Sequence, residues 1–518
     1  MKKLSKKIGY GEWRVSMKKE IQRWKVFEQK FNEETNCNQF LDVELSAVFI
    51  NKNLKVEVTG FYNGNNEFLV RFMPEEIGEW AFTTKSNIEE LNGLAGSFIC
   101  ISEQVDNHGP VKVLGDLVAS NSRDRVITKD EDFHFCYADG KTFYPFGTTC
   151  YAWLHQPLQL QERTLVQMED SPFNKLRMCI FPKHYIYNLN EPIYHVYEGN
   201  IEDGFDFTRF NIDFFKLLDK RVEELDKLGI EADIILFHPY DRWGFSEMSQ
   251  EQDVMYLKYI VSRLAAYKNV WWSLANEYDL MQKKTIDDWE LFAKVIQRYD
   301  PYNHLRSIHN WLKVYDYTKS WVTHCSIQRT DIYKTVENTN EWRDSYKKPV
   351  IIDECGYEGN INYGWGNLTG EDMTRRFWEA IVRGGYLSHG ETYTHPDDII
   401  WWAHGGKLHG SSVERIAFLR KIVEEAPGYI TPLKITPEII GDNWDVPCGT
   451  VGEKYKLYYF GFSRPSFRTY KLPEDKKYKI GIIDTWDMTI TQLNGEFSGD
   501  IRIELPGKQY IAVRMTEV

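Results

Sequence analysis

Two glutamates follow short apolar runs, at positions where a pair of carboxyl groups could perform acid–base chemistry. Glu277 follows Val270–Ala275 and Asn276, and Glu354 follows Pro349–Asp353. Such a pair cleaves a glycosidic bond when one group protonates the leaving oxygen and the other attacks the anomeric carbon. A separation of about 5–5.5 Å suits a retaining double displacement, whereas about 6.5–9.5 Å leaves room for water and inversion.

The two glutamates need a scaffold that brings distant parts of the chain to one cavity. Residues 123–427 predict eight strand–helix units with short apolar strands and amphipathic helices. This alternation is typical of a parallel sheet, and eight units in about 300 residues favour a closed TIM (β/α)8 barrel. An open doubly wound sheet is the alternative, but no glycine-rich phosphate fingerprint follows the first strand. The expected strands are Phe143–Gly147, Leu176–Phe181, Ala232–Phe237, Val270–Ala275, Arg306–His309, Trp321–Cys325, Pro349–Asp353 and Gly385–His389.

In such barrels the active site lies at the carboxyl ends of the strands. Glu277 follows the fourth expected strand and Glu354 follows the seventh, so both are expected to face one cavity. Strands four and seven lie on opposite sides of the barrel mouth. A sugar can therefore fit between the two carboxyl groups.

Antiparallel β-sandwiches are expected on both sides of the barrel. Residues 1–122 contain alternating segments such as Leu54–Thr59, and residues 428–518 return to short strands separated by Gly, Pro and Asn-Gly. A chain of 518 residues exceeds the single core of about 250–300 residues that one domain builds. We expect a multidomain α/β plus β protein, with an N-terminal sandwich, a central barrel and a C-terminal sandwich.

Both catalytic segments carry a family resemblance. Trp271–Glu277 (WWSLANE) resembles the acid/base motif of clan A glycoside hydrolases, especially family 5, and Lys348–Gly356 (KPVIIDECG) resembles their nucleophile motif. The resemblance implies retaining chemistry, with Glu277 as acid/base, Glu354 as nucleophile and Asn276 as a ligand of the sugar 2-hydroxyl. The flanking sandwiches resemble uncharacterised domains that accompany such barrels, so the likeness covers nearly the whole chain but is specific only at the two motifs.

Substrate-binding roles are expected for further residues that follow the barrel strands. The resemblance implies that Arg177 holds the nucleophile carboxylate, although a barrel-wall ion pair is the alternative. It also implies sugar contacts for His238 and His324, which could instead be structural. Glu391 is a third carboxyl group near the mouth and a weaker rival for a catalytic role. Other candidates are Trp153 after the first strand and, for an aromatic platform under the sugar, Tyr393, Trp401 or Trp402.

Composition excludes several classes of function. The formal net charge of −13 argues against a nucleic-acid partner, which a basic patch normally marks. We find neither an apolar run long enough to cross a membrane nor a secretory signal, and the eight scattered cysteines suggest a reduced, cytoplasmic protein. No HxH or HExxH motif is present, and hydrolysis at an anomeric carbon needs no cofactor, so we expect neither metal nor cofactor.

We therefore expect a retaining, exo-acting glycosidase that cleaves short plant-derived oligosaccharides; the sequence leaves a homo-oligomer open. A catalytically inactive carbohydrate-binding or structural protein on the same scaffold is the alternative. A third interpretation is an aldolase or isomerase, which would use a Schiff-base lysine or a metal cluster. Neither is evident in the sequence, since Lys183 is the only lysine close to the end of an expected strand.

Overall fold

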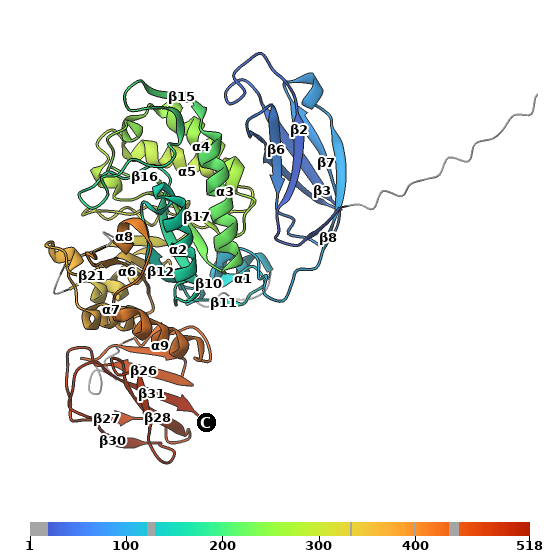
Figure 1. Ribbon diagram of the computed structural model, residues 1–518. Coiled ribbons are helices and arrows are strands. Elements are labelled where there is room, and N and C mark those ends of the chain that lie inside the picture. Colours follow the sequence, from blue (N-terminus) through green and yellow to red (C-terminus); the bar gives the residue numbers. More distant parts are fainter. Residues whose placement is uncertain (1–18, 122–129, 332–333, 397–399, 435–444) are drawn as a thin grey trace, which may run out of the picture.

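The computed structural model describes residues 19–121, 130–331, 334–396, 400–434 and 445–518. A central barrel has one β-sandwich beside its helices α3 (Ile212–Lys227) and α4 (Gln250–Leu264), as Figure 1 shows. A second sandwich lies beside α7 (Gly370–Val382) and α9 (Ser412–Glu424). The expected fold class, a TIM barrel between two antiparallel sandwiches, is confirmed.

The barrel is an eight-stranded parallel sheet in the order β18-β17-β16-β13-β12-β22-β20-β19. The two outermost strands close the circle through a parallel bridge between His309 and Ser326, and the amide of Thr323 donates to the carbonyl of Arg306 at 2.9 Å. The carboxyl ends of all eight strands therefore open on one face. The strands are β12 (Phe146–Thr149), β13 (Lys175–Cys179), β16 (Glu231–Phe237), β17 (Val270–Ala275), β18 (Arg306–Ser307), β19 (Cys325–Gln328), β20 (Val350–Glu354) and β22 (Tyr386–His389).

The helices between these strands bury one apolar side against the barrel. Capping boxes at Ser249 and Thr285 begin α4 and α5 (Ile286–Tyr299). Each hydroxyl accepts a hydrogen bond from the backbone amide three residues later, at Gln252 or Asp288, and that residue's side chain accepts one from the amide of the cap residue. The fifth of the eight expected strand–helix units lacks its helix, because the described residues 308–324 form turns and bends. The other helices are α2 (Leu158–Glu169), α6 (Thr339–Tyr346) and the short α8 (Trp401–His404).

The sixth barrel strand lies later in the chain than its apolar pattern predicts. The structure has β19 at Cys325–Gln328 in place of Trp321–Cys325. Ser326 interrupts the apolar pattern of β19, yet it is fully buried and donates to the carboxylate of Asp353 at 2.5 Å. This buried polar contact hides the true strand from a prediction based on hydrophobicity.

A small antiparallel sheet closes the amino end of the barrel. It consists of β9 (Val111–Val113), β10 (Phe135–Tyr137) and β11 (Thr142–Phe143). Helix α1 (Leu114–Asn121) directly follows β9. The ring of Phe135 lies 5.5 Å from those of Trp271 and Tyr386, which stand near the starts of their strands. The small sheet therefore leaves the opposite, carboxyl end of the barrel uncovered.

The N-terminal sandwich packs two sheets over an aromatic core. The rings of Phe49 and Phe72, one from each sheet, stack at 4.1 Å. One sheet has the order β1-β8-β7-β3-β4 and the other β2-β6-β5. Their bounds are β1 (Glu20–Gln22), β2 (Phe27–Asn32), β3 (Leu45–Asn51), β4 (Leu54–Thr59), β5 (Phe61–Tyr62), β6 (Glu67–Phe72), β7 (Gly78–Ser86) and β8 (Ala95–Ile101).

The C-terminal sandwich pairs a six-stranded sheet, β24-β25-β26-β31-β28-β29, with the two strands β27 and β30. Its apolar residues form a core of their own, which includes Tyr478, Ile480 and Val513. The strands are β24 (Thr431–Pro432), β25 (Cys448–Val451), β26 (Tyr455–Tyr459), β27 (Phe467–Lys471), β28 (Tyr478–Asp484), β29 (Thr489–Gln492), β30 (Asp500–Glu504) and β31 (Ile511–Glu517).

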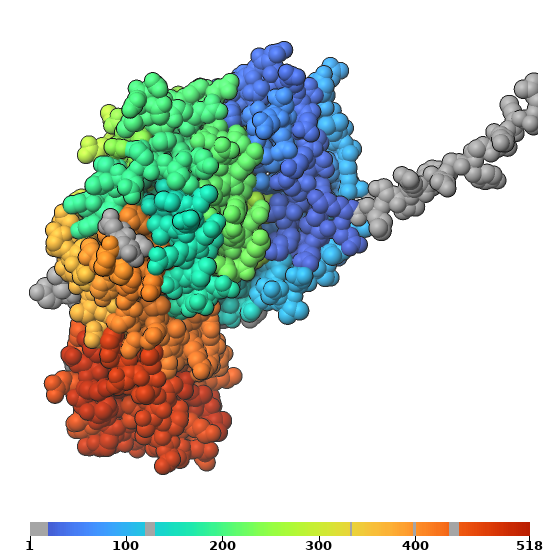
Figure 2. Space-filling model, viewed as in Figure 1, coloured from blue at the N-terminus to red at the C-terminus, as the bar shows by residue number. Residues whose placement is uncertain are grey.

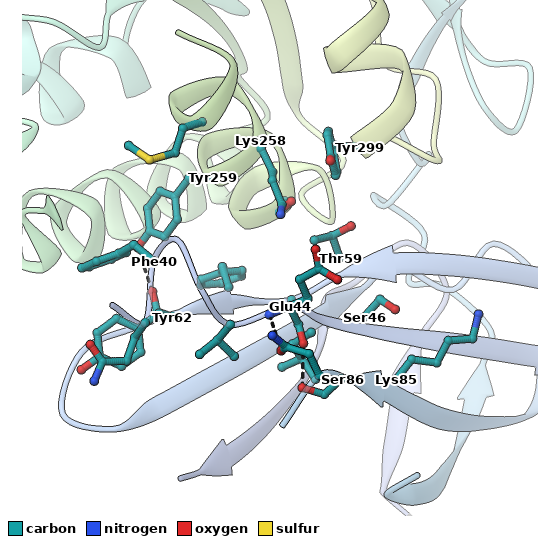
Figure 3. A pocket seen from close by; sticks show the side chains of 18 of the residues that line it. Phe40, Glu44, Ser46, Thr59, Tyr62, Lys85, Ser86, Lys258, Tyr259 and Tyr299 are labelled. Carbon is teal, nitrogen blue, oxygen red and sulfur yellow. Dashed lines mark hydrogen bonds between the residues drawn. The ribbon is translucent and has the colours of Figure 1, made fainter. Parts of the chain in front are cut away.

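The two sandwiches occupy separate sides of the barrel (Figure 2). A polar cleft of about 820 Å³ lies between the N-terminal sandwich and helices α4 and α5 (Figure 3), with Lys258 and Tyr299 on the helical side and Ser46 and Lys85 on the sandwich side. Within the described residues, no helix combines the length and apolarity needed to cross a membrane.

Candidate active site

A cavity of about 150 Å³ opens at the carboxyl end of the barrel, and Glu277 and Glu354 both line it. The two glutamates follow β17 and end β20, as the strand positions predict. Aromatic side chains make most of the remaining wall. The other lining residues are Lys183, Tyr185, Tyr240, Trp311, Gln328, Thr330, Tyr357, Trp365 and Trp402.

Glu277 stands in a backbone conformation that a glutamate adopts only at a cost. Its φ is +53°, in the left-handed region, which is uncommon for a residue with a side chain. Backbone hydrogen bonds hold the turn on both sides, since the amide of Asn276 donates to Phe237 and that of Tyr278 donates to His309, both at 2.9 Å. These bonds offset the strain of the turn that carries the Glu277 side chain into the cavity.

The environment of Glu277 favours its protonated form. Burial and then the negative charge of Glu354 raise the pKa of Glu277 to about 7, against the opposing positive charge of Lys183. A carboxyl group with this pKa still carries a proton in a large fraction of molecules near neutral pH. Glu277 can thus serve as a proton donor.

Tyr240 donates a hydrogen bond from its hydroxyl to Oε2 of Glu277. Burial and the charge of Glu277 raise the pKa of Tyr240 well above its usual value, so the phenol remains a donor. His238 positions this tyrosine, because its Nδ1 accepts a hydrogen bond from the backbone amide of Tyr240 at 3.2 Å. The Nε2 of His238 in turn donates a hydrogen bond to the carbonyl of Phe181 at 3.0 Å. His238 is therefore absent from the cavity lining and instead holds the tyrosine that contacts Glu277.

Glu354 is held by a second tyrosine. The hydroxyl of Tyr151 donates to Oε1 of Glu354, and burial and the charge of Glu354 raise the pKa of Tyr151. Nδ1 of His309 lies 3.9 Å from the same oxygen. Because burial holds the pKa of His309 well below its usual range, this ring is neutral near pH 7 and the contact is no ion pair.

A buried network of charges lies beneath the two glutamates, inside the barrel. Nζ of Lys175 lies 2.7 Å from Asp233 and 2.8 Å from Asp353, and a guanidinium nitrogen of Arg177 lies 3.2 and 3.1 Å from the same carboxylates. Arg177 also donates to Oδ1 of Asn276 at 3.4 Å. Arg177 thus contacts Asp353, which precedes Glu354, and Asn276, which precedes Glu277. It supports both motifs from the barrel interior.

Lys183 and Trp402 form the aromatic and cationic side of the cavity. Nζ of Lys183 lies 4.2, 4.3 and 4.8 Å from the ring centres of Tyr151, Tyr240 and Trp402. Such cation–π contacts stabilise the charge of Lys183, a residue that is only 4% exposed. Trp402 is the one of the three platform candidates that lines this cavity.

The other two platform candidates lie outside the cavity lining. The indole of Trp401 donates to the hydroxyl of Thr148 at 2.9 Å and is buried in the barrel wall. The hydroxyl of Tyr393 donates to Oε1 of Glu358 at 3.2 Å.

Three further candidates also lie apart from the two glutamates. Trp153 is buried and donates to the carbonyl of Gln161 at 3.1 Å. His324 precedes β19 instead of following it, so it packs at the amino end of the barrel, 5.3 Å from the ring of Trp271. The Glu391 carboxyl accepts the amides of His409 and Gly410 at 2.5 and 2.7 Å.

Several cavity residues received no site assignment from the sequence. Tyr240 lies two residues after His238, in the segment that follows β16, and Gln328 ends β19. Trp311 and Tyr357 lie on loops, and Trp365 lies in a single 3-10 turn, Gly364–Gly366; no periodicity predicts the conformation of these segments. Apart from Trp365, their common signal is a polar or aromatic residue at or shortly after the end of a barrel strand. In the part of the chain that the structure describes, no group of three or more His, Cys, Asp or Glu side chains is placed to hold a metal ion.

The chain matches three family models in sequence. Residues 129–429 match the apiosidase-like catalytic domain, which is more than half of the chain. Residues 20–87 match a domain of unknown function, DUF5060, and residues 444–516 match another, DUF5605. These matches agree with the barrel and with the sandwiches on either side.

Solved structures give the same result. A provisionally assigned glycoside hydrolase from Bacteroides vulgatus ATCC 8482 is 40% identical, with a TM-score of 0.89 over 97% of this chain and 100% of the other. A family 5 glycoside hydrolase from the same strain is 17% identical, covers 76% of this chain and 93% of its own, and shares the fold with a TM-score of 0.58. No curated protein matches the sequence significantly. The barrel, its two glutamates at one cavity and these matches agree, and the chain belongs to the family of apiosidase-like catalytic domains, with the fold of a glycoside hydrolase.

Proposed function

We propose that this protein is a retaining glycoside hydrolase in which Glu277 is the acid/base and Glu354 the nucleophile. The observation that carries the proposal is that both carboxyl groups line one cavity while the pKa of Glu277 is raised to about 7. A carboxyl group with a raised pKa can serve as the acid while a neighbouring carboxyl group acts as the nucleophile. The glycoside hydrolase relatives support the same reaction class.

In the first step, an oxygen of Glu354 bonds to the anomeric carbon as the bond from that carbon to the leaving oxygen breaks. Glu277 transfers its proton to the leaving oxygen, so an alcohol departs. The hydroxyl of Tyr151 holds Oε1 of Glu354, and that of Tyr240 holds Oε2 of Glu277. The two tyrosines thereby fix which oxygen of each carboxyl group is free to react.

In the second step, Glu277 takes a proton from water, and the water oxygen bonds to the anomeric carbon. The bond from that carbon to Glu354 breaks, which frees the nucleophile and leaves the sugar with its original anomeric configuration. The net change is hydrolysis, and Glu277 ends the cycle protonated as it began.

We further propose exo action on short oligosaccharides. A cavity of about 150 Å³ offers room on the scale of one sugar unit, not of a long chain. The loop after β13 and the loop after β20 meet across one rim, where the hydroxyl of Tyr187 donates to Asn362 at 2.9 Å. A closed rim favours attack at a chain end over attack within a polymer.

The substrate we propose is a plant-derived glycoside, and the family's name adds apiose, a branched pentose, to the sugars to be tested. The cysteines of the described residues are all free thiols, and all but Cys37 are buried, which supports action in the reducing cytoplasm.

The test is hydrolysis of a panel of 4-nitrophenyl glycosides that includes β-mannoside, β-glucoside, β-galactoside, xyloside and apioside. We expect the wild type to cleave at least one sugar, and Glu277→Gln and Glu354→Gln each to lose about a hundredfold or more of kcat. If the wild type binds sugars but cleaves no natural or synthetic glycoside, the protein is an inactive carbohydrate-binding protein instead. Wild-type rates in both variants would show that other residues carry the reaction.

A further inference from the structure

Trp311 is a large apolar side chain held at the mouth of the catalytic cavity. It lines the cavity together with Glu277 and Glu354, yet 42% of its surface is exposed. The deeper aromatic residue, Trp402, is only 6% exposed. An exposed tryptophan at a cavity rim has a face to offer to a ligand, whereas a buried one is committed to packing.

The backbone that carries Trp311 is fixed in place. The carboxylate of Asp279 accepts hydrogen bonds from the amides of Trp311, Leu312 and Lys313 at 2.6, 2.9 and 2.7 Å. The side chain of Asn310 accepts a hydrogen bond from the backbone amide of Gln328 at 3.1 Å. It also donates one to the backbone carbonyl of Gln328 at 3.2 Å. This loop is therefore organised before a ligand arrives, which lowers the entropy cost of binding.

The same contacts tie Trp311 to the side of the cavity that carries Glu277. Asp279 lies two residues after Glu277, and the amide of Tyr278 donates to the carbonyl of His309 at 2.9 Å. The group that protonates a leaving oxygen must face the leaving group. Trp311 thus stands beside the position where the leaving group departs.

The geometry points to Trp311 as the floor of a leaving-group subsite, which we propose binds a ring-shaped leaving group, a pyranose or an aromatic ring, by stacking. The inference rests on the proposed function, because it takes Glu277 as the acid. The cleaved sugar lies deeper, against Trp402, and the leaving ring lies toward solvent. Trp311 then determines which leaving groups are preferred, while the sugar that is cleaved is recognised elsewhere.

The test compares two glycosides of the sugar that the wild type cleaves: the phenyl glycoside, whose leaving group is a ring, and the methyl glycoside. In Trp311→Ala we expect kcat/KM for the phenyl glycoside to fall roughly five- to tenfold, and that for the methyl glycoside to change less than about twofold. Trp311→Phe keeps a smaller ring and should recover part of the loss. Leu312→Ala, at the exposed neighbouring position, is the matched control and should behave as the wild type with both substrates.

An equal loss with both glycosides in a folded Trp311→Ala protein would overturn the inference and leave the proposed function standing. No change with either glycoside would overturn it as well. If the wild type cleaves neither glycoside of any tested sugar, the proposed function fails and the inference falls with it. Circular dichroism and thermal unfolding of each variant exclude misfolding as the cause of a loss.

Discussion

At Glu277, the pKa that the proposed reaction needs lowers the stability of the fold. Its carboxyl group is buried, faces the charge of Glu354 and has a pKa of about 7. An acid for glycoside cleavage needs this raised pKa. Each unit by which folding raises the pKa, however, destabilises the folded protein with an ionised Glu277 by about 1.4 kcal/mol. Under the proposed mechanism, the protein keeps a residue whose ionisation destabilises the fold because the reaction needs its proton.

The first prediction concerns the stability of Glu277→Gln. The unfolded glutamate releases its proton near pH 4.5, whereas the folded one keeps it until about pH 7, so wild-type stability falls as pH rises through this window. The amide has no proton to release. We expect Glu277→Gln to be more stable than the wild type at pH 8, by up to about 3 kcal/mol, and similar to it at pH 4.

Thermal unfolding at both pH values checks this prediction, with Glu90→Gln as an exposed control. The control should show the same difference from the wild type at pH 4 and at pH 8. A Glu277→Gln protein whose stability difference does not depend on pH would mean that Glu277 is ionised in the folded protein and is no acid.

At the level of single residues, the sequence identifies the cavity glutamates but not the side chains around them. Glu277 and Glu354 are found because each follows an apolar strand in a recognisable motif. Tyr240, Lys183 and Trp311 come from loops, where neither periodicity nor spacing fixes the direction of a side chain. Only the folded chain shows that they meet.

Among the elements, the short parallel pair β21 (Glu358–Gly359) and β23 (Glu391–Thr392) anchors the start of α9. The Glu391 carboxyl accepts two backbone amides of the segment before α9, and the Glu358 carboxyl accepts the amides of Ser411 and Ser412 at 2.7 and 3.1 Å. Burial raises the pKa of Glu391 to about 8. This arrangement favours a structural role for the third carboxyl group.

The second prediction follows from that role. In Glu391→Gln the new amide group can accept only one of the two backbone donors, so we expect a loss of about 1–3 kcal/mol in stability. The kcat should stay within about threefold of the wild type, in contrast to the loss in Glu354→Gln, because a residue outside the cavity contributes little to the reaction. Calorimetry and turnover of the responding glycoside check both parts. A folded Glu391→Gln protein without activity would make Glu391 a catalytic candidate again.

At the level of elements, the sequence predicts strands well where burial is uniform. The apolar runs before Glu277 and Glu354 correspond closely to β17 and β20. The error at β19 arises because Ser326 is polar but buried against Asp353. A pattern of hydrophobicity alone cannot distinguish such a residue from a solvent-exposed one.

Across the whole molecule, a buried ion network attaches the N-terminal sandwich to the barrel. Arg71 of β6 lies 2.8 Å from Asp219 of α3, and Arg263 of α4 lies 2.7 Å from the same carboxylate. Burial alone would raise the pKa of Asp219, but the charges of the two arginines outweigh it and lower the pKa. The sandwich is thus fixed beside two barrel helices rather than tethered loosely.

The third prediction is that Arg71→Met destabilises this attachment. Removal of one partner leaves buried charge without compensation, and we expect a loss of about 3–5 kcal/mol. The control is Lys85→Met, which breaks an exposed pair with Glu57 and should cost at most about 1 kcal/mol. Calorimetry distinguishes the two variants, and an Arg71→Met protein as stable as the control would show that the network contributes nothing. The order of the three parts could be predicted from sequence, but the contact between the sandwich and the barrel could not, because Arg71 and Asp219 are 148 positions apart in the chain.

The fourth prediction tests the double displacement itself, by trapping the intermediate with a 2-deoxy-2-fluoro glycoside of the responding sugar that carries a good leaving group. We expect the intact mass of the wild type to rise by one fluorosugar, and peptide mapping to place the sugar on Glu354. Glu354→Gln should gain no mass under the same conditions. Turnover of the substrate with inversion and without an adduct, or an adduct on another residue, would contradict the assignment of Glu354 as the nucleophile.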